Sequence, residues 1–89
     1  MNFKYENELL TLLDDDKVLG TINYKIEGDI YTILRVYVLP IYQGKGYGKT
    51  LLEEVVRYSK TNKLKIKPVC SYAVVYFEKH SEYNDLLAK

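Results

Sequence analysis

The fold is decided by residues 42–50, YQGKGYGKT, in which positions 44, 46 and 48 are glycine. Upstream, residues 33–38 alternate as a strand does, and Pro40 ends that strand because proline cannot donate a ladder hydrogen bond. Downstream, a helix is predicted over residues 47–61, because one helix face collects Leu51, Leu52, Val55, Val56 and Ser59. A glycine-rich turn that opens a helix presents backbone N–H groups and the positive end of the helix dipole to an anion. The stretch therefore predicts a strand–turn–helix unit that holds phosphate.

The rest of the chain predicts an α+β fold. Strands are expected over residues 8–13, 18–26, 33–38 and 64–69, and a second helix over residues 71–79. The first three strands follow one another through short turns, so they form a predicted antiparallel meander. The fourth strand is entered through a helical crossover and is expected to lie parallel to its neighbour. The predicted order is β-β-β-α-β-α in a single domain, residues 1–89.

Strict alternation assigns the faces of the two central strands. In the second predicted strand it places Val18 and Leu19 on opposite faces, with Val18 on the side of the isoleucine and tyrosine that follow. In the third it places Ile33 with Arg35 and apart from Val36.

Composition bounds the class of protein. The 89 residues are 47% hydrophobic and 28% charged, with a formal net charge of +1, as in an ordinary globular domain. We expect no specific nucleic-acid binding, and the lysines around position 63 are interpreted as a solvated helix end. Cys70 is the one cysteine, which excludes an internal disulfide, and no cluster has metal-ligand spacing. No signal peptide or membrane-spanning run is recognised, so a cytoplasmic protein is expected.

Two nucleotide motifs fail on residues 42–50. A Walker A loop would need glycine at Gln43, and a dinucleotide fingerprint would need glycine at Lys49. A Walker A loop also belongs to a parallel sheet, whereas this loop follows antiparallel strands.

A third motif fits. Gln43-x-x-Gly46-x-Gly48, after a Val-x-Pro strand end and before an amphipathic helix, resembles the acetyl-CoA loop of the GNAT N-acetyltransferase superfamily. The resemblance implies a truncated GNAT-like fold and an acetyl-CoA or coenzyme A site at Gln43, Gly44, Lys45, Gly46, Tyr47, Gly48 and Lys49. A plain glycine-rich turn is the alternative.

The resemblance extends to the flanking strands. In this superfamily the strand before the loop bears a bulge, and its backbone binds the pantetheine arm; that role falls here to Tyr37, Val38 and Leu39. The N–H of Val38 is the candidate for polarising the thioester carbonyl. The next strand, residues 64–69, is expected to splay away and leave a slot for the cofactor.

The second predicted helix departs from the superfamily pattern. Phe77 takes the place of the tyrosine that usually protonates the leaving thiolate, and Cys70 takes the place of an asparagine. Tyr72 is a candidate replacement for the acid. Cys70 resembles a cysteine of a subgroup of very short GNAT-like proteins, where it would be either an acetyl-accepting nucleophile or a packing residue. His80 is interpreted as a surface residue at the helix end.

The acceptor side is predicted to be open and acidic at its edge, with a plain solvated turn as the alternative interpretation of the acidic run. GNAT proteins usually insert helices between the first two strands, but here Asp14-Asp15-Asp16-Lys17 joins them directly. The leading hypothesis is an acetyl-CoA-dependent N-acetyltransferase that acts on an unidentified amine of a small molecule, peptide or protein, directly or through Cys70. An open site favours a peptide or protein over a small metabolite. The alternative is a CoA-binding or interaction module with a degenerate active site. A homodimer that covers the open side is a further expectation.

Overall fold

The computed structural model describes residues 1–88, so Lys89 of the predicted domain lies outside the described residues. One mixed sheet has the strand order β1-β2-β3-β4-β5. The strands are β1 (Asn2–Glu6), β2 (Leu9–Asp14), β3 (Lys17–Glu27), β4 (Ile30–Val38) and β5 (Lys65–Pro68). The helices are η1 (Pro40–Tyr42), α1 (Tyr47–Thr61), α2 (Ser71–Lys79) and η2 (Ser81–Leu86). The α+β class and the predicted elements are confirmed.

β1 is a strand that the sequence did not predict. It pairs antiparallel with β2 at the edge of the sheet, so the meander has four strands instead of three. Only Tyr5 of β1 is half-buried, and the other four side chains are exposed. β1 therefore lacks the alternation by which a strand is recognised.

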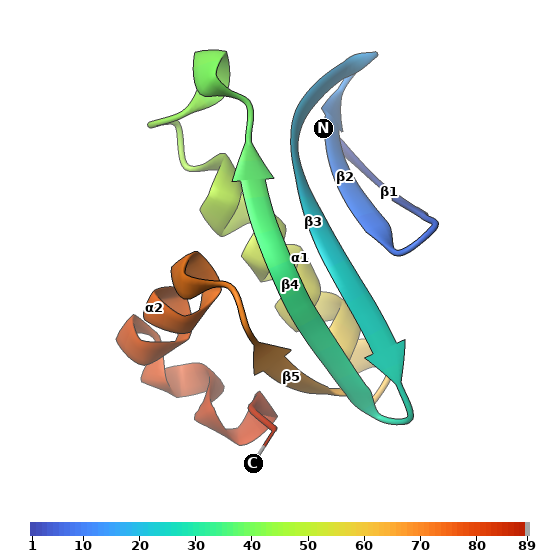
Figure 1. Cartoon of the computed structure of the whole chain (residues 1–89), viewed down its shortest axis with the longest axis vertical. Helices are drawn as coiled ribbons and strands as arrows, with labels where there is room; N and C mark the ends of the chain where they lie inside the picture. The colour runs from blue at the N-terminus through green and yellow to red at the C-terminus, as the bar shows by residue number, and fades with distance from the viewer. Residues whose placement is uncertain (89) are drawn as a thin grey trace.

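Helices cover only one face of the sheet (Figure 1). α1 lies behind β3 and β4, and the side chains predicted for its buried face are all buried. α2 and η2 extend the helical layer beside β5. The core is the interface between these helices and the sheet, and the opposite sheet face is open.

Two β-bulges correct the predicted faces. Leu12 pairs with Gly20 and Leu13 with Val18, so Leu19 is the extra residue in β3. As a result Leu19 is 2% exposed and Val18 38% exposed, the reverse of the predicted grouping. An extra residue shifts the side-chain alternation by one position, which no strict period can anticipate.

The second bulge lies in β4. Asn23 pairs with Arg35 and Tyr24 with Ile33, which leaves Leu34 as the extra residue. Ile33 therefore shares the α1 face with Val36 instead of the face of Arg35, and the predicted grouping of Ile33 is wrong. The bulge itself is where the resemblance implied one, in the strand before the glycine-rich loop.

Candidate functional site

β4 and β5 separate at the bulge and leave one edge of β4 open. Their parallel pairing ends at Ile33 with Pro68. The next two N–H groups of the chain, those of Val69 and Cys70, both donate to the carbonyl oxygen of Ile33, at 2.9 and 3.3 Å. Within residues 1–88 no strand pairs with β4 on that side beyond Ile33. The predicted slot between splayed strands is present.

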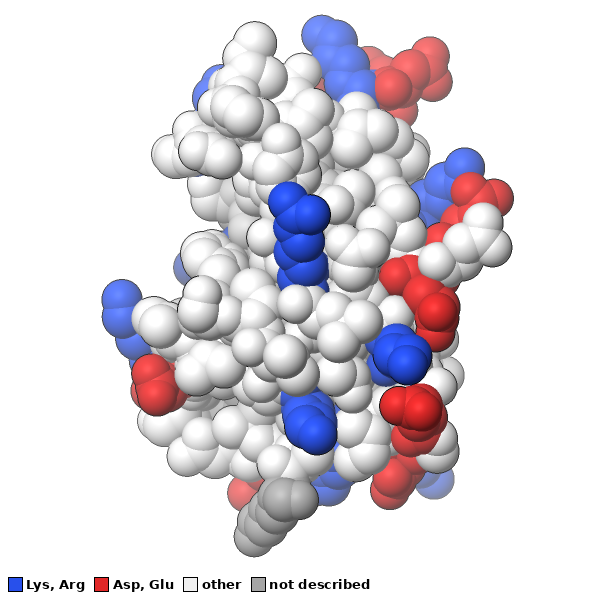
Figure 2. Space-filling model, in the orientation of Figure 1, with Lys and Arg blue, Asp and Glu red and all other residues white. Residues whose placement is uncertain are grey.

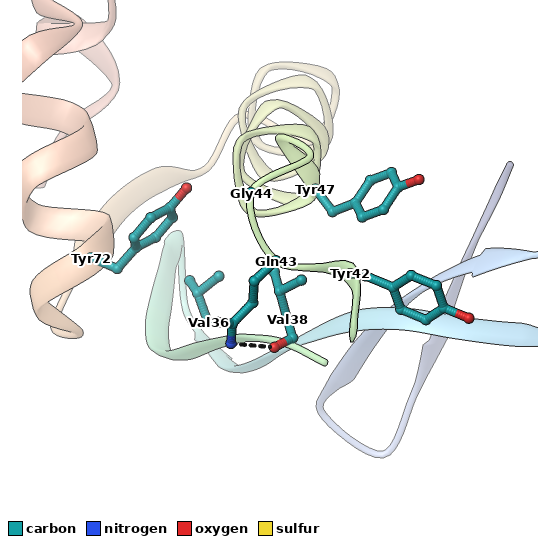
Figure 3. Close-up of a pocket in the computed structure, with 7 residues that line it drawn as sticks. All are labelled: Val36, Val38, Tyr42, Gln43, Gly44, Tyr47 and Tyr72. Carbon is teal, nitrogen blue, oxygen red and sulfur yellow. Dashed lines mark hydrogen bonds between the residues drawn. The ribbon is translucent and has the colours of Figure 1, made fainter. Parts of the chain in front are cut away.

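The backbone of Val38 faces this slot. The N–H of Leu39 donates to Leu19 on β3 at 3.1 Å. Because successive residues of a strand direct their N–H and C=O groups to opposite edges, those of Val38 are directed to the open edge. The carbonyl oxygen of Val38 accepts a hydrogen bond from Gln43 Nε2 at 3.0 Å, which agrees with that direction (Figure 3). The Val38 N–H is thus available to a group in the slot.

A pocket of about 320 Å³ occupies the slot (Figure 3). Its lining comes from the end of β4, the glycine-rich loop and the first residues of both helices. The lining residues are Val36, Val38, Tyr42, Gln43, Gly44, Tyr47 and Tyr72. The pocket thus joins the open edge of β4 to the start of α1.

The start of α1 is built to receive an anion. Gly44 and Gly46 both have φ of +83°, a conformation that side chains other than glycine rarely adopt. Gly46 is the N-cap of α1, no side chain caps the helix, and its first turn contains no acidic residue. The N–H groups of that turn have no intrahelical partner, and the dipole adds positive charge. This backbone, with Lys45 and Lys49 exposed beside it, fits the phosphates of coenzyme A.

Gly48, which was predicted to belong to the anion-binding turn, lies in the first turn of α1. Tyr72 of α2 lies directly against it. A Cβ added at Gly48 would lie 2.6 Å from Tyr72 Oη and 2.9 Å from Tyr72 Cζ. The absence of a side chain at Gly48 therefore lets the Tyr72 ring reach the first turn of α1.

Several predicted site residues lie near the pocket without lining it. The Tyr37 side chain faces the open side of the sheet, where Arg35 Cζ lies 5.1 Å from its ring centroid. The N–H of Leu39 is bonded to Leu19, so it is occupied by the sheet. Of the three consecutive residues expected to bind the pantetheine arm, only Val38 presents its N–H to the slot.

Cys70 lies at the base of the split, outside the pocket lining. It is the N-cap of α2, half-buried, and packs against the hydrophobic core. Its N–H points to Ile33. Tyr72, two residues further on, is the α2 side chain that lies against the start of α1 at Gly48.

The aromatic residues at the end of α2 and just beyond it do not line the pocket. Phe77 is 2% exposed and belongs to the core, so the position of the usual tyrosine is purely structural here. Tyr76 is also buried, in edge contact with Phe77, and its burial raises the pKa of the phenol to about 12. His80 stands at the end of α2, with Nδ1 3.4 Å from Glu82 Oε2. These residues consolidate the packing of α2 and η2.

Two pocket residues, Val36 and Tyr42, were not predicted from the sequence. Val36 lies two residues before Val38 on the same strand face, so that spacing was an available signal. Tyr42 ends the η1 turn that Pro40 begins, and its ring makes an edge contact with Tyr47 at 6.3 Å. A tyrosine on each side of the glycine-rich loop was the available signal.

Two other kinds of site find no support in the described part of the chain. Residues 1–88 contain no group of three His, Cys, Asp or Glu side chains placed to hold a metal ion. None of the described helices is long and apolar enough to span a membrane.

A mixed sheet split beside a glycine-rich helix start defines an acetyl-CoA-binding class of protein, and comparison with known families agrees. A family model described as GCN5-related N-acetyl-transferase matches residues 7–86. The chain belongs to this family of acetyltransferases, for which acetyl-CoA is the cofactor. A search of curated proteins gave no match.

Solved structures give the same result. A GCN5-like protein of Staphylococcus aureus, itself a predicted N-acetyltransferase, is 30% identical with a TM-score of 0.79, covering 98% of this chain and 87% of that one. PaiA N-acetyltransferase of Thermoplasma acidophilum in complex with coenzyme A is 27% identical with a TM-score of 0.66, over 81% of this chain and 48% of that one. The Escherichia coli ribosomal-protein-S18-alanine N-acetyltransferase shares the fold, at 18% identity and a TM-score of 0.69, over 84% of this chain and 53% of that one. The chain thus spans about half the length of the latter two enzymes.

Proposed function

We propose that the protein transfers the acetyl group of acetyl-CoA to an amine of a peptide or protein by direct attack of that amine. The observation that carries the proposal is the open edge of β4. It directs the Val38 N–H into a pocket that also reaches the uncapped start of α1. A thioester and a pyrophosphate need these two kinds of donor at opposite ends of one slot.

Each part of the slot has a distinct task in this proposal. The backbone of Gly44, Gly46 and the first turn of α1 would bind the pyrophosphate, with Lys45 and Lys49 adding charge at the rim. Gln43 fixes the loop to β4 through its bond to the Val38 carbonyl. When bound, acetyl-CoA supplies a thioester carbonyl carbon that an amine can attack.

The chain's own groups then act on charge and protons. The Val38 N–H stabilises negative charge on the carbonyl oxygen, as an oxyanion-hole donor does. A C–N bond forms and a C–S bond breaks; the amine gives up one proton to solvent, and the sulfur takes one. Tyr72 Oη is the group we propose to supply that proton, because it lies at the pocket wall where Phe77 does not.

Transfer through Cys70 is the competing route, and the two routes predict different products. Intact-protein mass spectrometry after incubation with acetyl-CoA separates them, with Cys70→Ala as the matched variant. We expect no adduct that hydroxylamine removes, and equal acetylation of a lysine peptide by both proteins. A hydroxylamine-sensitive adduct on the wild type alone, with turnover lost in Cys70→Ala, would establish the relay instead.

The same experiment tests the non-catalytic alternative. Coenzyme A retained under native conditions, with no acetylated product across a broad panel of peptide and small amines, would leave a binding module. Failure to retain coenzyme A at all would reduce the glycine-rich loop to a structural turn and contradict the proposal.

A further inference from the structure

The open face of the sheet is basic at its centre. Alternation along the strands places the cations Lys25, Arg35, Lys65 and Lys67 on this face, against the single carboxylate of Glu27 in β3, β4 and β5. The whole chain carries a net charge of only +1, so this is a local excess. Figure 2 views this face and shows Lys and Arg side chains down its middle, with acidic side chains mainly at the margins.

Two of the cations stand in one cross-strand row. Lys25 pairs with Thr32, and Thr32 pairs with Lys67, so the two lysines flank Thr32 on the same side of the sheet. Adjacent strands are about 4.8 Å apart, which places the stems of these lysines about 10 Å apart. Both are exposed, and like charges at this separation favour an anion between them.

The other charged residues of this face are Lys65, Glu27 and Arg35. Lys65 donates to the backbone carbonyl oxygen of Asp85, which draws it toward the C-terminal segment. Glu27 is at the far end of β3 and lines a hollow with Thr32 and Lys67 at that end of the sheet. Between this hollow and the slot, Arg35 is a further exposed cation.

Arg35 connects the basic face to the slot. Its guanidinium lies over the Tyr37 ring, 5.1 Å from the centroid, and Tyr37 is the residue before Val38. At about 3.3 Å per residue, Arg35 is about 10 Å from Val38 along the strand. The bulge at Leu34 takes up one residue, so the row of Thr32 is about 17 Å away. Measured along β4 from Val38, the proposed reaction centre, Arg35 is therefore the nearer cation, and the lysines that flank Thr32 are further away.

We propose that this face binds the acceptor, and that the acceptor is a peptide segment with acidic side chains near the acetylated amine. This inference rests on the proposed function for its start point. An extended peptide laid along β4 would bring side chains about three and about five residues from the amine opposite Arg35 and the lysine row, because these two positions share one face of an extended chain. Glutamate or aspartate at these positions complements the surface, whereas lysine or arginine is repelled.

A fluorescent peptide with blocked termini and one lysine tests the inference. Glutamates stand three and five positions from the lysine in one peptide, and glutamines replace them in its match. Binding is measured by polarisation with coenzyme A present, for the wild type, for Arg35→Gln with Lys67→Gln, and for the control Lys63→Gln in the turn after α1. We expect the acidic peptide to bind about tenfold more tightly to the wild type and the control, and the preference to fall to about twofold or less in the double variant.

Salt and assembly state provide the remaining tests. The preference should shrink as ionic strength rises from about 0.05 to about 0.5 M, because these charges are exposed. Equal binding of the two peptides to the wild type, or an unchanged preference in the double variant, would overturn the inference. A concentration-dependent dimer that dissociates in the double variant would also overturn it, because the acidic run at Asp14–Asp16 of a second copy would then be the occupant.

The two proposals fail separately. Acetylation of lysine peptides without regard to neighbouring acids would overturn the basic-face inference and leave the acetyltransferase proposal intact. Selective binding of the acidic peptide without any acetylation would support the surface and contradict the proposed function.

Discussion

At the scale of single residues, the contact between Gly48 and Tyr72 gives a sharp test of the proton donor. Gly48→Ala would place a Cβ 2.6 Å from Tyr72 Oη, so the exposed ring must turn away. Tyr72→Phe keeps the ring and removes only the hydroxyl. If Tyr72 Oη is the acid, we expect each change to lower kcat about tenfold or more, and the double variant to lose little further.

The controls for this pair are stability and coenzyme A affinity. Alanine is the better helix former by roughly 1 kcal/mol, so Gly48→Ala should not lower the free energy of unfolding by much. Full activity of Tyr72→Phe would exclude Tyr72 as the proton donor. Losses that add in the double variant would show that Gly48 acts on the cofactor independently of Tyr72.

Single residues also explain where the sequence-based predictions of the fold failed. Asn7 and Glu8 have φ of 53° and 62°, which makes a two-residue turn with both positions left-handed. Such turns are normally recognised by a glycine, as at Gly28 between β3 and β4. Glutamate at the second position hides the first hairpin, and with it β1. The bulge residues Leu19 and Leu34 each shift the side-chain alternation by one position, so the predicted faces of β3 and β4 were partly wrong.

At the scale of elements, a buried carboxylate on α1 binds β1 through a hydrogen bond. The side chain of Glu54 on α1 is 5% exposed and accepts two hydrogen bonds from Arg57, both at 2.7 Å. Its Oε2 also accepts a bond of 2.6 Å from the Tyr5 hydroxyl of β1. Burial raises the pKa of Glu54, but the bonds from Arg57 and Tyr5 outweigh it and leave the pKa below the usual 4.5. Burial, together with donation to Glu54, raises the pKa of the Tyr5 phenol.

This arrangement predicts a pH-dependent stability difference for Glu54→Gln. The variant loses the negative charge to which Arg57 and Tyr5 donate hydrogen bonds. We therefore expect the free energy of unfolding at pH 7 to fall by about 1–3 kcal/mol. Because the folded-state pKa of Glu54 is depressed, its contribution is complete above the unfolded pKa and is lost as pH falls through the folded pKa. The difference between wild type and variant should therefore shrink below about pH 4.5.

Urea denaturation at several pH values measures this difference. Glu53→Gln is the matched control, since Glu53 is the exposed neighbour on the same helix turn. A loss for Glu54→Gln that stays constant down to pH 3, or an equal loss for Glu53→Gln, would contradict the assigned role.

At the scale of the whole molecule, the glycine-rich loop of the pocket could be predicted from the sequence, whereas the α2 side chain that completes the pocket could not. The glycine-rich loop and the helix start are contiguous in the chain, so local rules are enough to find Gln43, Gly44 and Gly46. The contact of Tyr72 with Gly48 depends on how α2 is placed against α1, which no local pattern encodes. Cys70 and Tyr72 are two residues apart in sequence, yet only Tyr72 lines the pocket.

Cofactor binding is expected to be measurable as a gain in stability. A chain of 89 residues buries a modest core, so a ligand that binds only the folded state contributes a large share of its stability. Coenzyme A at about 100 times its dissociation constant would add about 2.7 kcal/mol. For a domain of this size that corresponds to a rise in Tm of about 10 °C or more.

Differential scanning fluorimetry checks this value, with ATP as the matched ligand and Gly46→Ala as the matched variant. We expect ATP to give a much smaller rise, and Gly46→Ala to lose the coenzyme A effect because its left-handed φ is costly for alanine. An equal rise with ATP would mean that the loop recognises a nucleotide phosphate alone, and that the open edge of β4 takes no part in binding.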